Sequence, residues 1–364
     1  MTIGDLIKEL EKWAPPALQE SYDNAGLITG DASEKVSGVL ISLDCTEDVV
    51  EEALRRGCNM IVSHHPIVFR GLKSLTGANY VERTVLKAIR GGVALYAIHT
   101  NLDNVDHGVN HRIADQLGLV KREVLRPMPA HLRQLVVYVP RKDADKVRDA
   151  LFAGGAGHIG NYDECSFNIG GTGTFRPLEG SNPTDGQHME RSYADEVQIS
   201  VIYPAERERS ILQAMVQSHP YEVVAHEIYA LQNADQTRGA GMVGNLPEGM
   251  DEMAFLSLLK ERFGCGCVRH TALLNRQVKR VALCGGSGSF LLRDAIAAKA
   301  DVFVTSDFKY HEFFDSERKI VIADIGHYES EQFTIDLIGS FLREKFSTFA
   351  VHFTQEVTNP INYF

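Results

Sequence analysis

The chain has 364 residues and a formal net charge of −11, so it is long for one hydrophobic core and we expect two or three domains. The acidic balance argues against a nucleic-acid partner, because such partners need a basic surface. No apolar run approaches the about 20 residues of a membrane-spanning helix. The first residues also lack the layout of a signal peptide, which predicts a cytoplasmic protein with no membrane partner.

The first 127 residues alternate helices with strands. The apolar spacing predicts helices over 3–13, 46–56 and 81–90 and strands over 36–43, 59–62 and 93–98. This alternation is typical of a mostly parallel α/β sheet. In such sheets the chemistry lies beyond the carboxyl ends of the strands, where the pattern places His64-His65 and His99 to Asp103.

The pattern changes after residue 127, where Pro127-Met128-Pro129 suggests a domain boundary. The expected elements are strands over 135–139, 165–175, 197–203 and 226–231 and helices over 143–152 and 206–217. Their order predicts a ferredoxin-like α+β domain over 128–232, inserted into the main domain.

The α/β pattern then resumes, so the main domain is expected to comprise 1–127 and 233–364. The expected elements are helices over 253–263, 290–300 and 331–346, strands over 278–283, 302–305, 320–325 and 348–354, and a glycine-rich turn over 284–289. That turn could cradle a phosphate on backbone N–H groups, but a plain tight turn explains it equally well.

Two adjacent histidines, His64 and His65, close the strand over 59–62, and Pro66 follows them. Imidazole is the commonest side-chain metal ligand. Successive side chains of an extended chain point to opposite faces, so one ion cannot easily take both. The pair therefore suits two neighbouring ions, one on each imidazole.

The segments that flank the insert resemble each other. Strand, helix and strand run from Val39 to Val62 and again, over an equal length, from Val281 to Val304. The next strand in each segment leads to a histidine with a carboxylate four residues later, in His99 to Asp103 and in His327 to Glu331. Because four residues make about one helical turn, both groups of each pair can face one point. We therefore expect two pseudo-repeated α/β halves that form one domain and share one cleft.

This arrangement predicts a dinuclear metal site. The candidate ligands are His64, His65, Asp103, His327 and Glu331, with His99 and Asp307 as spare equivalents. Five ligands suffice for two ions only if one carboxylate binds both ions. Glu331 is the expected bridge, because its side chain is longer than that of Asp103. Nitrogen and oxygen ligands without cysteine suit Zn, Fe, Mn, Co or Ni. Two close ions generate a hydroxide near neutral pH, so hydrolysis is the expected reaction. The competing interpretation is that these residues do not share a metal site and are separate surface residues or partners of other side chains.

Proton transfer is assigned to two further histidines. His99 lies beside the expected ions, and His311 follows Asp307 and Lys309. Either could move protons in the reaction. A satisfied structural histidine is an equally good explanation of His311.

The motifs around these residues resemble a known family. Ser63-His64-His65-Pro66, His99-Thr100-Asn101-Leu102-Asp103 and Gly326-His327-Tyr328-Glu329-Ser330-Glu331 are similar to motifs of the GTP cyclohydrolase I type 2 homologues, the dinuclear-metal-centre hexameric proteins. Asp23-Asn24-Ala25-Gly26-Leu27 and Gly285-Gly286-Ser287-Gly288 fit the same pattern. The insert looks like the PII/CutA-like module of the longer members.

The resemblance implies a ligand set and an assembly. His64 and Asp103 would bind one ion, His65 and His327 the other, and Glu331 both. It also implies a toroidal homohexamer whose metal sites face an inner cavity. We expect a metal-dependent hydrolase acting on a nucleotide-like or phosphate-bearing substrate. The alternative is a non-catalytic metal-binding regulator or scaffold whose insert senses a ligand.

Overall fold

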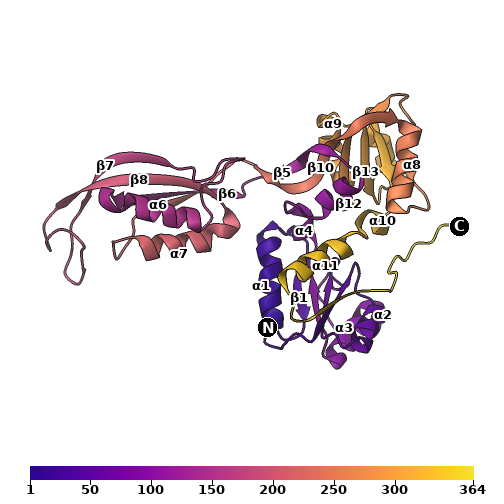
Figure 1. Cartoon of the computed structure of the whole chain (residues 1–364), viewed down its shortest axis with the longest axis horizontal. Helices are drawn as coiled ribbons and strands as arrows, with labels where there is room; N and C mark the ends of the chain where they lie inside the picture. The colour runs from indigo at the N-terminus through magenta and orange to yellow at the C-terminus, as the bar shows by residue number, and fades with distance from the viewer. The chain divides into compact units, whose positions relative to one another are not determined.

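The structure is a computed structural model that describes residues 1–364 (Figure 1). It is a mixed α/β protein with three sheets. Two compact units are present: Met1–Pro127 together with Gln236–Phe364, and Met128–Asp235. No helix is long and apolar enough to cross a bilayer.

The first sheet of the larger unit has five strands in the order β1-β4-β3-β2-β15. Its strands are β1 Gly26–Thr29, β2 Gly38–Ser42, β3 Met60–Ser63, β4 Ala94–Ala97 and β15 Ala350–Phe353. Strands β15, β2, β3 and β4 are parallel, while β1 is antiparallel to β4. Ser42, Ser63 and Ala97 are in register, so β2, β3 and β4 end at the same edge.

Helices occupy the connections of this half. They are α1 Ile3–Trp13, α2 Glu47–Arg55, α3 Tyr80–Gly91, α4 Thr100–Asn104 and α5 Val109–Gln116, with a 3-10 turn at Pro16–Leu18. The helix expected over 3–13 is therefore confirmed as α1. Thr46 caps α2 by accepting a hydrogen bond from the Val49 amide, as its place before the helix leads one to expect.

The second sheet of the larger unit has six strands in the order β11-β14-β13-β12-β10-β5. Its strands are β5 Val120–Met128, β10 Asp235–Asp251, β11 Arg269–His270, β12 Gln277–Ser287, β13 Val302–Ser306 and β14 Val321–Asp324. Strands β12, β13 and β14 are parallel, and β10 is antiparallel to β12. The helices of this half are α8 Glu252–Phe263, α9 Leu292–Ala297, α10 His327–Glu331 and α11 Thr334–Lys345, with 3-10 turns at Ser289–Leu291 and Tyr310–Ser316 (η5).

Several expected elements were wrong in extent. The residues expected as a turn over 284–289 mostly continue β12, which pairs with β13 as far as Ser287 and Ser306. The expected helix over 331–346 is two helices, because α10 ends at Glu331 and α11 begins at Thr334. The helix expected over 290–300 covers only Leu292–Ala297. Strands β5 and β10 were not expected, since both carry glycine, proline and charged residues that hide a strand pattern.

The smaller unit, Met128–Asp235, has a four-stranded antiparallel sheet in the order β7-β8-β6-β9. Its elements in chain order are β6 Leu132–Pro140, α6 Ala144–Ala153, β7 Phe167–Phe175, β8 Ser192–Pro204, α7 Glu208–Ser218 and β9 His226–Ala230. Alternate residues of β6 and β8, such as Val137 and Ile199, are buried against α6 and α7 and form a separate core.

Helix α4 is fixed by the core of the larger unit. Leu102 lies in its middle, is fully buried, and belongs to the largest apolar cluster, which also contains Ile98 and Val62. Asn101 and Asn104 on the same helix donate hydrogen bonds to the carbonyl oxygens of Ala14 and Leu18. These contacts hold the short helix that carries Asp103.

Leu102→Ala should therefore destabilise the protein by about 2–5 kcal/mol, because it removes a buried side chain and leaves a cavity. The measurement is urea unfolding followed by circular dichroism. Leu75→Ala is the matched control, since Leu75 is 46% exposed, and it should change stability by less than about 0.5 kcal/mol. Equal effects of the two substitutions would contradict this account of α4.

Candidate metal centre

Four histidines from three strand ends face one another. His64 and His65 follow β3, His99 follows β4, and His327 opens α10 after β14. The backbone amides of His64 and His65 donate to the carbonyl oxygens of Ser42 and Leu43, so the pairing of β3 with β2 continues into the histidine pair. Ring centroids of neighbouring imidazoles lie 4.9–5.4 Å apart.

Each of these imidazoles has an oxygen acceptor at Nδ1. The pairs are His64 with Ile98 O at 2.9 Å, His65 with Asp44 Oδ1 at 2.8 Å, His99 with Asp23 Oδ1 at 2.8 Å and His327 with Asp307 Oδ2 at 2.7 Å. An imidazole whose Nδ1–H donates to oxygen has a free lone pair on Nε2 when it is neutral. This is the arrangement in which histidine binds metal through Nε2.

The Nε2 atoms of His65 and His327 meet at one carboxylate. Each lies 3.0 Å from Glu331 Oε2, and the two nitrogens are 3.3 Å apart. Glu331 is buried, and it reaches this point because α10 places it one turn after His327. His65, His327 and Glu331 thus form one group of ligand atoms that could hold an ion.

The other oxygen of Glu331 faces a second group. His64 Nε2 lies 3.8 Å from Glu331 Oε1 and 3.6 Å from Asp103 Oδ1. Both His64 Nε2 and Asp103 Oδ1 are buried without a hydrogen-bond partner. Buried polar atoms nearly always have a partner, so two such atoms facing each other fit a shared cation. His64, Asp103 and Glu331 therefore form a second group that could hold an ion.

The pKa values of the three imidazoles near Glu331 differ because their surroundings differ. Burial lowers the pKa of His64 to about 4. Burial opposes the charge of His65 and His327, but hydrogen bonds with Asp44 and Glu331 outweigh it at His65 and raise its pKa to about 9. At His327 the charge of Glu331 and the hydrogen bond with Asp307 raise the pKa to about 11. Two cationic imidazoles thus supply the positive charge beside Glu331.

The two carboxylates of the centre differ. Burial and the charge of Glu331 raise the pKa of Asp103 well above its usual range. Burial also opposes the charge of Glu331, but His327 and the hydrogen bonds from the imidazoles hold its pKa well below the usual range. Glu331 is therefore the carboxylate around which the positive groups gather.

His99 belongs to the same cluster without contacting Glu331. Its ring lies 5.3 Å from that of His64 and 5.4 Å from that of His65, and an edge-to-face contact at 5.5 Å joins it to Phe69. Asp23, which accepts from His99, also accepts hydrogen bonds from the amide and hydroxyl of Thr100. Although burial raises the pKa of Asp23, these hydrogen bonds lower it to about 2.

The structure thus brings together His64, His65, His99, Asp103, His327 and Glu331. Asp307, expected as a spare ligand, instead accepts from His327 Nδ1. His311 lies apart on η5, where it is exposed and stacks with Phe314. Sequence reasoning missed Asp44 and Asp23 as acceptors. The signal for Asp44 was its place directly after a buried strand that lies beside the histidine-bearing one.

The glycine-rich end of β12 packs against the centre. A Cβ on Gly286 would lie 2.5 Å from Glu331 Oε1 and 3.1 Å from His327 Nε2, and its φ of +57° is one that glycine adopts easily. The amide of Gly286 donates to Ser330 Oγ and that of Gly285 to Asn110 Oδ1. Since these N–H groups are already used, the structure favours a packing role over the phosphate cradle considered above.

Two cavities reach the cluster. One of about 930 Å³ is lined by His65, His327, Arg70, Tyr80 and Tyr328, and another of about 190 Å³ by Asp103, Glu331, Asn104 and Asn110. Both are also lined by Phe69, His99 and His327. The two groups of ligand atoms can therefore be approached from different sides.

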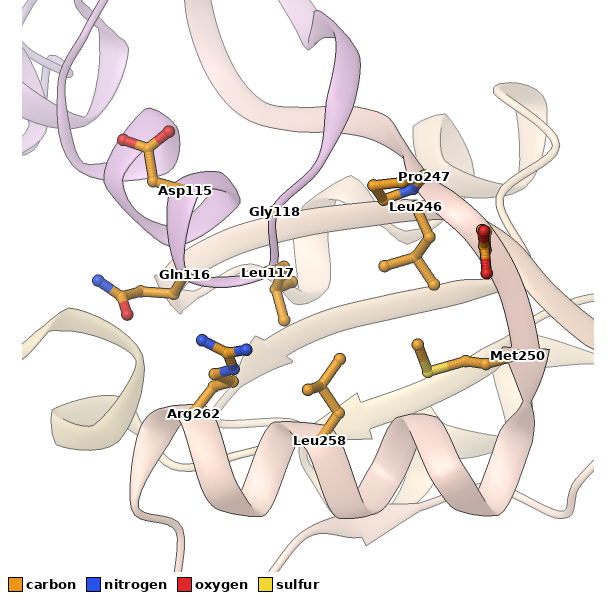
Figure 2. A pocket seen from close by; sticks show the side chains of 10 residues that line it. Asp115, Gln116, Leu117, Gly118, Leu246, Pro247, Met250, Leu258 and Arg262 are labelled. Carbon is orange, nitrogen blue, oxygen red and sulfur yellow. The ribbon is translucent and has the colours of Figure 1, made fainter.

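A further cavity of about 420 Å³ lies elsewhere in the same unit (Figure 2). Figure 2 shows Leu117, Leu246, Met250 and Leu258 forming much of its wall, with Arg262 at one side. Of its two acids, Asp115 and Glu248, Asp115 is already paired with Arg122 at 2.5 Å. This cavity lacks the converging imidazoles of the candidate centre.

Another group, Asp106, His107 and His111, could also hold an ion. Here the His107 amide donates to His111 Nδ1, which leaves the proton of a neutral ring on Nε2, 3.2 Å from Asp106 Oδ1. The ring is thus in the opposite tautomer to the four imidazoles above. Its hydrogen bonding suits an ordinary donor to Asp106 better than a metal ligand.

Comparison with known proteins assigns the family. The model of the DUF34/NIF3 family (NGG1p interacting factor 3) matches residues 1–360. The chain belongs to the DUF34/NIF3 family. A relative from Halalkalibacterium halodurans named GTP cyclohydrolase 1 type 2 homolog is 40% identical over 324 residues, which cover 88% of this chain and 87% of the relative. This bears out the resemblance seen in the motifs.

Further members agree over the full length. A Staphylococcus aureus protein of the same name is 34% identical over 368 residues and covers all of both chains. The crystal structure of a Bacillus cereus protein related to NIF3 is 36% identical, with a TM-score of 0.88 over 100% of this chain and 99% of that one. The mixed α/β architecture is therefore that of NIF3-related proteins.

Metal binding should release protons. His65 and His327 carry protons near neutral pH because their pKa values are raised to about 9 and 11, and a bound imidazole must be neutral. We expect about two protons from these rings, and an affinity that rises about 100-fold for each pH unit between about 6 and 8. Calorimetry in buffers of different ionisation enthalpy measures the release.

His107→Gln is the control for this prediction, since it removes a histidine outside the centre, and it should leave the proton release unchanged. An affinity for divalent ions that does not vary with pH in this range would contradict the protonation states given above.

Proposed function

We propose that this chain is a divalent-metal-binding protein and that its metal centre catalyses hydrolysis of a nucleotide-like or phosphate-bearing substrate. The observation that carries the proposal is the pair of buried, unpartnered atoms His64 Nε2 and Asp103 Oδ1 beside a carboxylate that two further imidazoles share. In this proposal His64 and Asp103 hold one ion, His65 and His327 hold a second, and Glu331 serves both.

The donor set limits the metal. Three imidazole nitrogens and two carboxylates suit Zn, Fe, Mn, Co or Ni. Ions of this kind, when bound, supply Lewis acidity and lower the pKa of coordinated water toward neutrality. The protein's own contribution is to fix the donors, since each imidazole is held by an acceptor at Nδ1.

His99 is the group proposed to move a proton. Asp23 accepts from its Nδ1 at 2.8 Å, which leaves Nε2 free, and the residue lies beside His64 and His65 and lines both cavities. His311 was the other candidate for this role, but its exposed place on η5, away from both cavities, supports it less. A histidine oriented by a carboxylate is a common general acid or base.

The larger cavity supports the substrate class. It combines a cation, Arg70, with the aromatic rings of Phe69, Tyr80 and Tyr328, and about 930 Å³ accommodates a molecule of nucleotide size. An aromatic ring can stack on such side chains while an anionic group pairs with arginine. The name shared by the relatives, GTP cyclohydrolase 1 type 2 homolog, refers to a nucleotide and agrees with this chemistry.

The finer architecture is also a proposal. The order β6-α6-β7-β8-α7-β9 and the sheet order β7-β8-β6-β9 support an inserted ferredoxin-like domain, which the resemblance to PII/CutA-like modules suggested. Each sheet of the larger unit contains three adjacent parallel strands that follow one another in the chain, β2, β3 and β4 in one and β12, β13 and β14 in the other, and this supports an internal repeat. We further propose a homohexamer, which a mass measurement in solution tests.

Glu331→Gln should weaken binding at both ions, because the shared carboxylate loses its charge. Removal of a hydrogen-bond partner of a ligand lowers metal affinity by about 10–100-fold, and we expect Glu331→Gln to lower it by more. Elemental analysis of purified protein measures the metal content. Glu344→Gln, on the exposed side of α11, is the control and should bind metal as the parent does. Unchanged metal content in Glu331→Gln would refute the shared carboxylate.

His99→Gln should lower kcat by about 10²–10⁴-fold while leaving the metal content unchanged, because it removes a proton-transfer group and no proposed ligand. The assay is a panel of nucleotides and phosphate esters given to the metal-loaded protein. His311→Gln is the matched control and should retain the parent rate. Loss of metal from His99→Gln would make His99 a ligand instead. Tight metal binding without turnover of any substrate would favour the regulatory alternative.

A further inference from the structure

The chain after β15 crosses the larger unit without forming a helix or strand. Figure 1 draws it as an extended yellow segment that ends at the label C. The Glu52 side chain anchors its start: Thr354 Oγ1 donates to Glu52 Oε2 at 2.5 Å, and the backbone N–H of Gln355 donates to both oxygens of Glu52 at 3.1 Å. We call Thr354–Asn359 the C-terminal strap.

The strap contacts a carboxylate that orients a histidine of the centre. Thr358 Oγ1 donates to Asp44 Oδ2 at 2.6 Å, while Asp44 Oδ1 accepts from His65 Nδ1 at 2.8 Å. Each oxygen of Asp44 thus has one partner, and the two partners together fix the plane of the carboxylate. A carboxylate held at only one oxygen can rotate, and the ring that it orients can then rotate with it.

The next residue of the strap reaches the other half of the centre. Asn359 Nδ2 donates to Glu329 Oε1 at 3.2 Å. Glu329 is buried on α10, between His327 and Glu331. Two successive residues of the strap therefore contact Asp44, which follows β2 and accepts from His65, and Glu329 on α10, the helix that carries His327 and Glu331.

The strap also forms part of the larger cavity. Thr358 and Asn359 line it, as do Pro360 and Ile361 directly after them. The same segment therefore contacts Asp44, the acceptor of His65, and lines the cavity in which a substrate would lie.

We propose that the C-terminal strap is a structural part of the metal centre and that Thr358 is a positioning residue, which fixes Asp44 and through it His65. This inference rests on the proposed metal binding. Loss of the partner of a ligating histidine usually weakens metal binding by about 10–100-fold. Thr358 is one hydrogen bond further from the ion than Asp44 is, so we expect its loss to weaken metal binding by the lower part of that range, about 10-fold.

The test uses three variants of the full chain. Thr358→Val keeps the shape of the side chain and removes the hydroxyl, and Thr358→Ser restores a hydroxyl without the methyl group. Thr354→Val is the matched control, since it makes the same change in the same strap at a hydroxyl whose carboxylate partner, Glu52, pairs with Arg56 and not with a histidine of the centre. The probe is Co²⁺, with affinity measured by competition with a chromophoric chelator and geometry by its visible absorption spectrum.

We expect Thr358→Val to bind Co²⁺ about 10-fold more weakly, with an altered spectrum, and Thr358→Ser to restore both. Thr354→Val should keep the affinity and spectrum of the parent even if its melting temperature falls. Parental affinity in Thr358→Val, failure of serine to restore it, or an equal loss in Thr354→Val would overturn the role of the Thr358 hydroxyl. A parent chain that binds no Co²⁺, Zn²⁺ or Mn²⁺ would instead refute the proposed metal centre, and the inference with it.

Discussion

The structure of this site depends on one constraint: every imidazole in it is held at Nδ1. Carboxylates hold His65 and His327, and a backbone carbonyl holds His64. Their Nε2 atoms are thereby directed at a single buried carboxylate, Glu331. If both were neutral, His65 and His327 would direct lone pairs at each other from Nε2 atoms only 3.3 Å apart. Such an arrangement is stable only with positive charge between the donors, supplied by protons or by cations.

The centre also lies between two cavities that are lined by different residues. His65 lines only the larger cavity, whereas Asp103 and Glu331 line only the smaller one. His99 and Phe69 line both cavities, so the proposed proton-transfer group lies where the two spaces meet. The parallel strands set this geometry, because β2, β3 and β4 end in register and deliver their side chains to one edge.

Much of this could be predicted from the sequence, because the signals were local. Adjacent histidines, a strand pattern before them, and a carboxylate one helical turn after His327 are visible without long-range information. Asp44, Asp23 and Thr358 were missed for the opposite reason. Asp44 and Asp23 accept from histidines that are distant in the sequence, and Thr358 donates to Asp44. The place of Asp44 after a buried strand indicates the right edge of the sheet, but it does not indicate which histidine is its partner. The break after Glu331 was missed because the apolar pattern runs through it into α11.

The positions of the proposed ligands in the chain also determine the order in which they are synthesised. His65 and Glu331 are 266 residues apart, and the whole of the Met128–Asp235 unit is made between them. Three of the five proposed donors, His64, His65 and Asp103, therefore leave the ribosome long before His327 and Glu331 exist, and the intervening unit can fold on its own core during that interval. Since Glu331 belongs to both proposed ligand groups, neither group is complete until α10 has been synthesised.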